Sequence, residues 1–292
     1  MAVAERFHRP WLARDIAMGA FLVILAAWAG RDAFADILRV AMKDVEQSHV
    51  LLVPAVAAWL LWLRRSRLRY VRYQPSTWGP LLILAGWLGV WWGFETDTRV
   101  LWHTGAMVTV LGAVLTLTGL SILRQFLPVF LVFLFAIPVP GFIRLRIARP
   151  LQEWAAFLTE SFLDILGVEA VREGSVLLIH GQQVAVGEAC NGMRMVFALT
   201  LVVYAFVFST PFKTSTRLVL LALSPVIALV CNIIRLIPTS MIYGYGDPDT
   251  AAMFHDVAGW VMLPIALFML IGVLKLLRWL ELPVTTWRLA GT

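Results

Sequence analysis

The strongest constraint on the fold of this chain is a succession of long apolar runs separated by short polar segments. The runs cover residues 16–30, 50–63, 78–94, 100–123, 126–143, 190–209, 218–243 and 255–277. A helix needs about 20 mostly apolar residues to cross a bilayer. Only 14% of the residues are charged and 60% are hydrophobic, whereas soluble domains carry about 25% charged residues. The sequence therefore predicts an all-α polytopic membrane protein with about eight transmembrane helices.

The basic residues predict the orientation of these helices. Five arginines and no acidic residue lie between Arg64 and Arg72, and short loops of this kind stay in the cytoplasm. Asp247 and Asp249 fall in a loop on the other side. Eight helices with both termini in the cytoplasm satisfy the bias of every loop, which predicts a multi-pass protein of the bacterial inner membrane. The net charge of +6 comes from these short loops, so it does not indicate nucleic-acid binding.

The first apolar run allows two interpretations. Three arginines precede it, and the Ala-Trp-Ala sequence at residues 27–29 resembles a signal-peptide cleavage site. The alternative is a first transmembrane helix that is retained. We favour the helix because so many further apolar runs follow it. Either interpretation leaves the later topology unchanged.

One long segment, residues 144–189, is not expected to cross the membrane. Pro150 would start an amphipathic helix in the membrane interface, and Gly167 would end it. Its acidic face comprises Glu153, Glu160 and Asp164. Residues 175–180 and 183–186 flank Gly181-Gln182 and predict a β-hairpin. We expect this short amphipathic helix and hairpin to form an extracytoplasmic insert within a single integral membrane domain, residues 1–292.

The segment at residues 187–194, Gly-Glu-Ala-Cys-Asn-Gly-Met-Arg, joins this insert to the sixth run. Cys190 would therefore begin a transmembrane helix at its outer end. The unpaired N–H groups of a helix N-terminus stabilise a thiolate, which is the nucleophilic form of cysteine. Cys190 is thus a candidate nucleophile, with Glu188, Asn191 and Gly192 as supporting neighbours. The alternative is a structural cysteine that packs as a small apolar residue.

The predicted topology brings two further reactive residues to the same membrane face. His255 would begin the last helix at its outer end, and next to Cys190 it becomes an acid–base partner. Arg235 precedes Gly244 by nine residues, which places it about 13 Å below the outer surface. An arginine inside a span is expensive unless it faces a polar cavity or partner, so Arg235 is a functional candidate. The alternative is that it snorkels to the interface, but that depth exceeds the length of its side chain.

Other polar residues are weaker candidates. Arg194 lies one turn after Cys190 and could stabilise a thiolate or reach lipid headgroups. His49, His103 and His180 could each be an ordinary histidine. Cys231 and Asn232 lie in the same span as Arg235; Cys231 is expected to be an inert thiol in an apolar setting, whereas Asn232 could support Arg235. The catalytic core would cover residues 187–260.

The residues exclude several other chemistries. Two cysteines beside or within apolar runs provide no disulfide framework. We see no cluster of Cys and His residues and no His-Glu-x-x-His helix, so no metal is expected. The Gly-x-Ser-x-Gly elbow of serine hydrolases is also missing. No organic cofactor is implied.

The order and spacing of these motifs resemble the exosortase/archaeosortase family of membrane cysteine transpeptidases, over most of the chain. The motifs are Ser48-His49 with Leu52-Val53-Pro54, Ile137-Pro-Val-Pro140, Gly167-Val168 with Glu173-Gly174, Ala189-Cys190-Asn191-Gly192-Met193-Arg194, Asn232-Ile-Ile-Arg235, and His255 with Gly259. Each motif is weak alone, and the combination is specific. The family usually has serine after the cysteine, where this chain has Asn191, so the subfamily is open.

The resemblance implies an activity and partners. Cys190 would cleave the C-terminal sorting signal of exported proteins, which consists of a Pro-Glu-Pro-like motif, an apolar helix and a basic tail. His255 would activate the thiol or protonate the leaving amine, and Arg235 would stabilise the oxyanion or orient the substrate. The acyl group would pass to an acceptor nucleophile, in a process linked to surface sorting and exopolysaccharide.

A second class of function also fits the residues. A non-catalytic transporter or assembly scaffold could use Arg235 to bind an anion inside the membrane. A scaffold should tolerate Cys190→Ser, whereas a cysteine enzyme should not. The single substitution Cys190→Ser therefore distinguishes the two interpretations.

Overall fold

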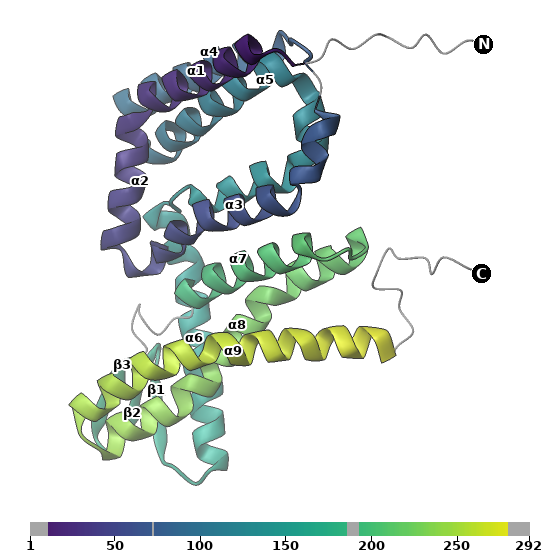
Figure 1. Cartoon of the computed structure of the whole chain (residues 1–292). Coiled ribbons are helices and arrows are strands. Elements are labelled where there is room, and N and C mark those ends of the chain that lie inside the picture. The colour runs from purple at the N-terminus through teal and green to yellow at the C-terminus, as the bar shows by residue number, and fades with distance from the viewer. Residues whose placement is uncertain (1–10, 72, 186–192, 280–292) are drawn as a thin grey trace. The chain divides into compact units, whose positions relative to one another are not determined.

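The structure, a computed structural model, describes residues 11–71, 73–185 and 193–279. The chain divides into two compact units, Met1–Pro140 and Gly141–Thr292, and each is described by itself. Helices dominate both units, and the second also contains a small antiparallel sheet (Figure 1). The mainly α-helical fold that the apolar runs predict is confirmed.

The first unit is a series of helices with short connections. They are α1 Ala13–Ala29, α2 Arg31–Lys43, the 3₁₀ helix η1 Val45–Leu52, α3 Val53–Leu63, η2 Arg65–Tyr70, α4 Trp78–Glu95, α5 Arg99–Leu131 and η3 Val132–Ala136. The chain bends by 65° between α1 and α2, at Gly30. Pro54 lies in the first turn of α3, a position where its missing N–H leaves no helical hydrogen bond unmade.

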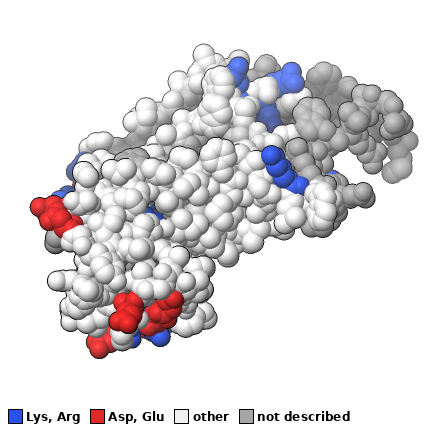
Figure 2. Space-filling model, turned by 90° about the horizontal axis from the view of Figure 1, so that it is seen from below, with Lys and Arg blue, Asp and Glu red and all other residues white. Residues whose placement is uncertain are grey.

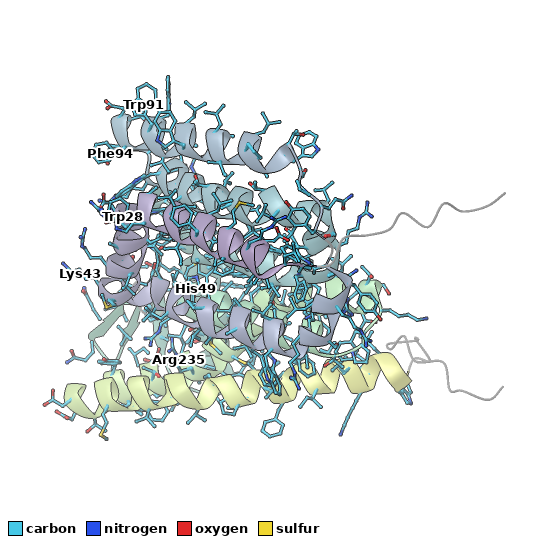
Figure 3. The ribbon with its side chains drawn as sticks, turned by 45° about the horizontal axis from the view of Figure 1, so that its top comes forward. Trp28, Lys43, His49, Trp91, Phe94 and Arg235 are labelled. Carbon is cyan, nitrogen blue, oxygen red and sulfur yellow. The ribbon has the colours of Figure 1, made fainter. Side chains whose placement is uncertain are left out.

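Helices α4 and α5 form a closely packed antiparallel pair because glycines line the contact. Gly79, Gly86 and Gly93 recur at every seventh residue of α4, and all three are buried. A Cβ atom added at Gly86 would lie 2.5 Å from Oγ1 of Thr109 on α5. Small residues of this kind let two membrane helices approach at backbone distance. Large side chains of α4, among them Trp91 and Phe94 in Figure 3, are exposed.

Helix α5 is longer than expected. The sequence predicts separate helices over residues 100–123 and 126–143, whereas α5 runs from Arg99 to Leu131 and η3 continues it to Ala136. The chain instead bends inside α5, where Gly119 has a φ of 53° and Phe126 departs from helical geometry. The carbonyl of Gln74 would lie 2.7 Å from a Cβ atom at Gly119. Only glycine combines that close approach with a positive φ.

Four described helical segments are long and apolar enough to cross a membrane, namely Glu46–Leu63, Arg99–Ala136, Thr214–Tyr245 and Val257–Leu277. The bent pair Ala13–Ala29 and Arg31–Lys43 provides a fifth if it counts as one span. Eight spans are therefore not confirmed. Two predicted spans form the single helix α5. Helix α4 contains several glycine and tryptophan residues, which lower its mean hydropathy. Helix α7, Met193–Ser209, has only 17 residues. The chain is a multi-pass membrane protein.

The second unit contains four helices and three strands within the residues described. They are α6 Gly141–Ile165, β1 Ala170–Glu173, β2 Val176–Ile179, β3 Gln182–Ala185, α7 Met193–Ser209, α8 Thr214–Tyr245 and α9 Pro248–Trp279. The expectation that a helix begins at Pro150 is wrong, because α6 begins at Gly141 and contains Pro150. The proline removes one backbone hydrogen bond, and the helix continues through it with Ala148 and Ala155 buried on either side.

The predicted hairpin is confirmed and belongs to a sheet of three strands. The strand order is β1-β2-β3, with both pairs antiparallel. His180 and Gly181 form the turn between β2 and β3 with φ values of 51° and 79°. Two successive positive φ values are typical of the type I′ turn that matches the twist of a hairpin. Strand β1 was not predicted from the sequence.

The sheet packs against α6 and the C-terminal half of α8. Leu163 of α6, Leu177 and Ile179 of β2, and Leu236 of α8 share one buried apolar cluster. Gly244 of α8 makes room for β2, since a Cβ atom there would lie 2.5 Å from Cγ2 of Ile179. The sheet is therefore anchored to the helix that carries Arg235.

Helices α7, α8 and α9 pack around a second apolar cluster that includes Leu199, Ile227 and Leu270. Arg217 fastens the turn between α7 and α8, because its guanidinium donates hydrogen bonds to the carbonyls of Val207 and Thr210. The contact with Val207 satisfies a carbonyl group in the last turn of α7, where carbonyls have no partner within the helix.

Charged residues mark opposite ends of these helices. Asp247 and Asp249 lie at the turn between α8 and α9, and Glu173 lies in the sheet beside it. Lys213 precedes α8, and Lys275 is near the end of α9. On the face drawn in Figure 2, acidic side chains gather at one end. The second unit thus has an acidic end and a basic end, as expected for helices that cross a membrane.

Candidate functional site

Arg235 is the centre of a buried polar group in the second unit. It lies in α8, within an apolar segment long enough to span a membrane, and only 8% of its surface is exposed. Its Nη2 donates a hydrogen bond of 2.8 Å to Oδ1 of Asn232, which is fully buried. The two residues are three apart, so both side chains leave the same face of the helix. Asn232 therefore orients one arm of the guanidinium.

The other arm of the guanidinium reaches the neighbouring helix. A Cβ atom added to Gly259 of α9 would lie 3.4 Å from Nη1 of Arg235. Arg235 is drawn between α8 and α9 in Figure 3. The missing side chain at Gly259 thus leaves space for the charged group against the α9 backbone.

Position 255 lies in the same part of α9. His255 is a residue of α9, four positions before Gly259, and residues four apart lie on one face of a helix. One helical turn separates them, about 6 Å along the axis. The structure therefore brings the backbone of α9 at Gly259 to Arg235, while the side chain of His255 lies outside the described residues.

Further polar residues extend the buried face of α8 toward its C-terminus. Thr239 and Ser240 are both buried, and Oγ1 of Thr239 donates a hydrogen bond of 2.7 Å to the carbonyl of Arg235. The positions of Asn232, Arg235 and Thr239 follow the three- and four-residue spacing of one helix face. A polar stripe inside a span is expensive in lipid and marks a functional face by default.

The start of α7 can be placed by its packing on α8. Oγ of Ser224 donates a hydrogen bond of 3.1 Å to Oγ1 of Thr200, and the two helices are antiparallel neighbours. Seven residues from this contact, about 10 Å along each axis, the register pairs Met193 of α7 with Cys231 of α8. Met195 accordingly packs against the apolar cluster that contains Cys231. Met193 is buried.

The remaining predicted site residues fall into two groups. Cys190, Glu188, Asn191 and Gly192 lie outside the described residues. Arg194 is the second residue of α7, and its side chain is exposed. The structure therefore assembles Arg235, Asn232 and the α9 backbone at Gly259, and it leaves the roles of these residues as predictions.

Cys231 has the environment of a structural cysteine. It is fully buried in the apolar cluster of α7, α8 and α9, with its sulfur 3.6 Å from the sulfur of Met269. Thiols in such surroundings behave as small apolar groups. This environment agrees with the expectation that Cys231 is not the nucleophile.

The first unit holds a buried hydrogen-bonded pair, His103 and Asp36, that the sequence did not reveal in full. Nε2 of His103 on α5 lies 3.2 Å from Oδ2 of Asp36 on α2, and His103 is fully buried. Arg39 also contacts Asp36, at 3.2 Å. His103 was a weak candidate, and Asp36 was missed. The signal was present in the amphipathic pattern of α2, whose buried face includes Asp36 together with Ala33 and Ile37.

His49, which is labelled in Figure 3, is buried in η1 of the first unit. Its Nδ1 lies 3.3 Å from the carbonyl of Glu46, one turn earlier. Among the residues that the structure describes, no group of three His, Cys, Asp or Glu side chains could hold a metal ion.

Comparison with known proteins places these features in a family. A protein-family model described as transmembrane exosortase matches residues 41–272. This range covers most of the chain and includes η1, the sheet, Asn232, Arg235 and residues 255–259. Neither the curated proteins nor the solved structures gave a match. The chain belongs to the transmembrane exosortase family.

Proposed function

We propose that the protein is a membrane-embedded cysteine transpeptidase that cleaves the C-terminal sorting signals of exported proteins. Family membership supports the processing of such signals. The observation that carries the proposal is the buried Arg235, which Asn232 orients at 2.8 Å and which abuts α9 one turn from His255. A buried, oriented guanidinium is suited to stabilise negative charge that develops in a transition state.

The proposed nucleophile is Cys190. Three residues connect it to Met193, a length of at most about 11 Å, and Met193 lies at the level of Cys231 on α8. Arg235 lies one turn beyond Cys231 on α8, about 6 Å along the helix axis. The antiparallel register of α7 and α8 therefore supports a site shared by Cys190 and Arg235.

The proposed reaction has two steps. The thiolate of Cys190 attacks the carbonyl of a peptide bond, and the resulting oxyanion is stabilised by Arg235. His255 donates a proton to the leaving amine, the C–N bond breaks, and a thioester forms. An acceptor nucleophile then attacks the thioester and releases the thiol. Arg194, at the exposed start of α7, would assist the thiolate or contact lipid headgroups.

We further propose that the site faces the extracytoplasmic side of the bacterial inner membrane. Helices α8 and α9 have acidic residues at the end near Arg235 and basic residues at the other. Lysine and arginine favour the cytoplasmic side. An eight-span arrangement with both termini in the cytoplasm would require α4, α7 and the two halves of the kinked α5 segment each to cross the membrane.

The experiment that tests this function uses an exported reporter fused to a three-part tail. The tail consists of a Pro-Glu-Pro-like motif, an apolar helix and basic residues, and the reporter is co-expressed with the protein. We expect a shortened reporter with the native protein and a full-length one with Cys190→Ala, at equal levels of both membrane proteins. Normal shortening by Cys190→Ala would overturn the proposal.

A second variant separates the enzyme from a transporter or scaffold. Cys190→Ser keeps a small polar side chain, which a scaffold should tolerate, whereas a cysteine enzyme would lose most of its activity. Cys231→Ser is the matched control, because Cys231 is the cysteine packed in the apolar core. Cleavage should survive in Cys231→Ser and be lost in Cys190→Ser.

A further inference from the structure

The sheet of the second unit has two edges that differ in how they are closed. The strand order β1-β2-β3 makes β1 and β3 the edge strands (Figure 1). An edge strand presents a row of N–H and C=O groups that can pair with another chain. Proteins commonly close such an edge when pairing is unwanted.

The edge at β1 is closed by α6. The turn at Gly174 makes Glu173 and Val176 a hydrogen-bonded pair, so the antiparallel alternation directs the N–H of Arg172 away from β2. Glu160 of α6 accepts this N–H at 2.9 Å and the Nε of Arg172 at 3.2 Å. A carboxylate thus occupies the position that a further strand would need.

The edge at β3 differs because, in the part of the chain that the structure describes, its outward backbone groups are not closed by a side chain of α6. The two-residue turn makes Ile179 and Gln182 a hydrogen-bonded pair, so Gln183 and Ala185 direct their N–H and C=O groups away from β2. Gln183 is exposed. Within the described ranges, no side chain or backbone group outside the sheet makes a hydrogen bond to Gln183. Among the residues that the structure describes, Gln183 therefore has no counterpart of the Glu160 contact.

We propose that the outer edge of β3 is a peptide-binding site, where an extended segment of the substrate pairs as a fourth strand. This inference rests on the proposed function and deepens it. The edge leads directly into the segment with Cys190, five residues after Ala185. The sheet is also fixed to α8, through Ile179 against Gly244 and through Leu236 beside Arg235.

Strand addition suits a peptide substrate for a physical reason. Main-chain hydrogen bonds hold the peptide with little dependence on its side chains, and they fix its register. Register decides which peptide bond meets the nucleophile. The scissile segment of an exported protein carries main-chain N–H and C=O groups, and these groups would pair with those of the β3 edge.

The first test removes a single N–H group. Gln183→Pro deletes the outward N–H without removing a hydrogen bond to β2, and proline is tolerated on an edge strand. Gln183→Ala is the matched control, because it shortens the side chain and keeps the N–H. We expect cleavage of the reporter to fall about tenfold in Gln183→Pro, for the loss of about 1.4 kcal/mol, and to remain near normal in Gln183→Ala. Equal losses in the two variants would overturn the proposal.

Two measurements separate a binding defect from misfolding and from failure of the proposed function. Gln183→Pro should keep its membrane level and the rate at which a small maleimide modifies Cys190. If Cys190→Ala abolishes cleavage while Gln183→Pro cleaves normally, the proposed peptide-binding site at β3 is wrong and the proposed enzyme function is retained. If Cys190→Ala cleaves normally, the proposed function itself is wrong.

The second test detects strand pairing directly. Gln183→Cys is introduced beside Cys190→Ser and Cys231→Ser, and the reporter carries one cysteine at successive positions before its apolar helix. Because side chains alternate along a strand, we expect disulfide cross-links at every second reporter position. Cross-linking with a helical spacing, with no spacing, or only between two copies of the protein would overturn the proposal.

Discussion

Nη1 of Arg235 lies 3.4 Å from the position that a Cβ atom would occupy on Gly259, so a guanidinium carried by α8 rests on the backbone of α9. Asn232 holds the same group from its own helix at 2.8 Å. The charged group is therefore positioned by two helices. Each of these contacts can be altered without changing Arg235 itself.

A large side chain at Gly259 should displace the guanidinium. Gly259→Ala places one carbon at ordinary contact distance, and we expect a small loss of cleavage. Gly259→Leu fills the space that Nη1 occupies, and we expect a loss of about tenfold or more, because a misplaced donor no longer meets the oxyanion. Gly272→Leu is the matched control on the same helix, because a Cβ atom added at Gly272 would have no neighbouring atom within 4 Å. A steeper loss in Gly272→Leu than in Gly259→Leu would contradict this account.

Replacing Arg235 tests the role of the planar guanidinium. Lysine keeps the positive charge and loses the fork that can contact Asn232 and an oxyanion together. We expect Arg235→Lys and Arg235→Ala to accumulate in the membrane and to cleave the reporter about a hundredfold more slowly, as for the loss of one oxyanion donor. Western blots of the reporter against time measure the rates. Near-normal cleavage by Arg235→Ala would remove Arg235 from the mechanism.

The two cysteines should differ sharply in reactivity. Cys231 is enclosed by apolar side chains beside Met269, whereas Cys190 is predicted to start a helix at the membrane surface. We expect a maleimide at neutral pH to modify Cys190 first and to stop cleavage as it does so. Mass spectrometry of the two cysteine peptides gives the order of modification. Faster modification of Cys231 would show that the nucleophile is assigned incorrectly.

The proposed orientation predicts which side of the membrane exposes the hairpin. Gln182, at the start of β3, is exposed. Gln182→Cys in a protein with Cys190→Ser and Cys231→Ser should react with an impermeant maleimide in intact spheroplasts. Arg67→Cys, in the basic loop of the first unit, should react only after permeabilisation. The reverse pattern would invert the topology.

Much of this fold follows from local sequence patterns, and its departures from them have identifiable causes. The hairpin was predicted because apolar residues flank a glycine turn. Strand β1 was missed because Ala170–Glu173 is short and half charged, and its N–H at Arg172 is satisfied by Glu160, ten residues before the strand begins. The sequence divided α5 in two because Arg124 was interpreted as the end of a span, whereas the helix continues through Arg124 to Leu131. The bend at Gly119 depends on its contact with Gln74, which no local pattern records.

In the candidate site, too, some features follow from local sequence patterns and others depend on the tertiary structure. Arg235 and Asn232 were identifiable because polar residues inside an apolar run are expensive and three-residue spacing puts them on one face. The contact of Arg235 with Gly259 depends on how α8 and α9 cross, which the sequence does not specify. Asp36 was missed because its partner His103 is 67 residues away. Long-range pairs of this kind require the tertiary structure.

The central claim is that Cys190 forms a thioester with the substrate, and trapping this intermediate tests it most directly. The reporter is co-expressed with the native protein, because His255 is needed for the thioester to form; the membranes are quenched in acid to preserve the thioester, and the membrane protein is digested and analysed by mass spectrometry. The account predicts a reporter-derived acyl group on the peptide containing Cys190, released by hydroxylamine and missing in Cys190→Ala. A cleaved reporter without any acyl group on Cys190, or an acyl group attached elsewhere in the chain, would contradict it.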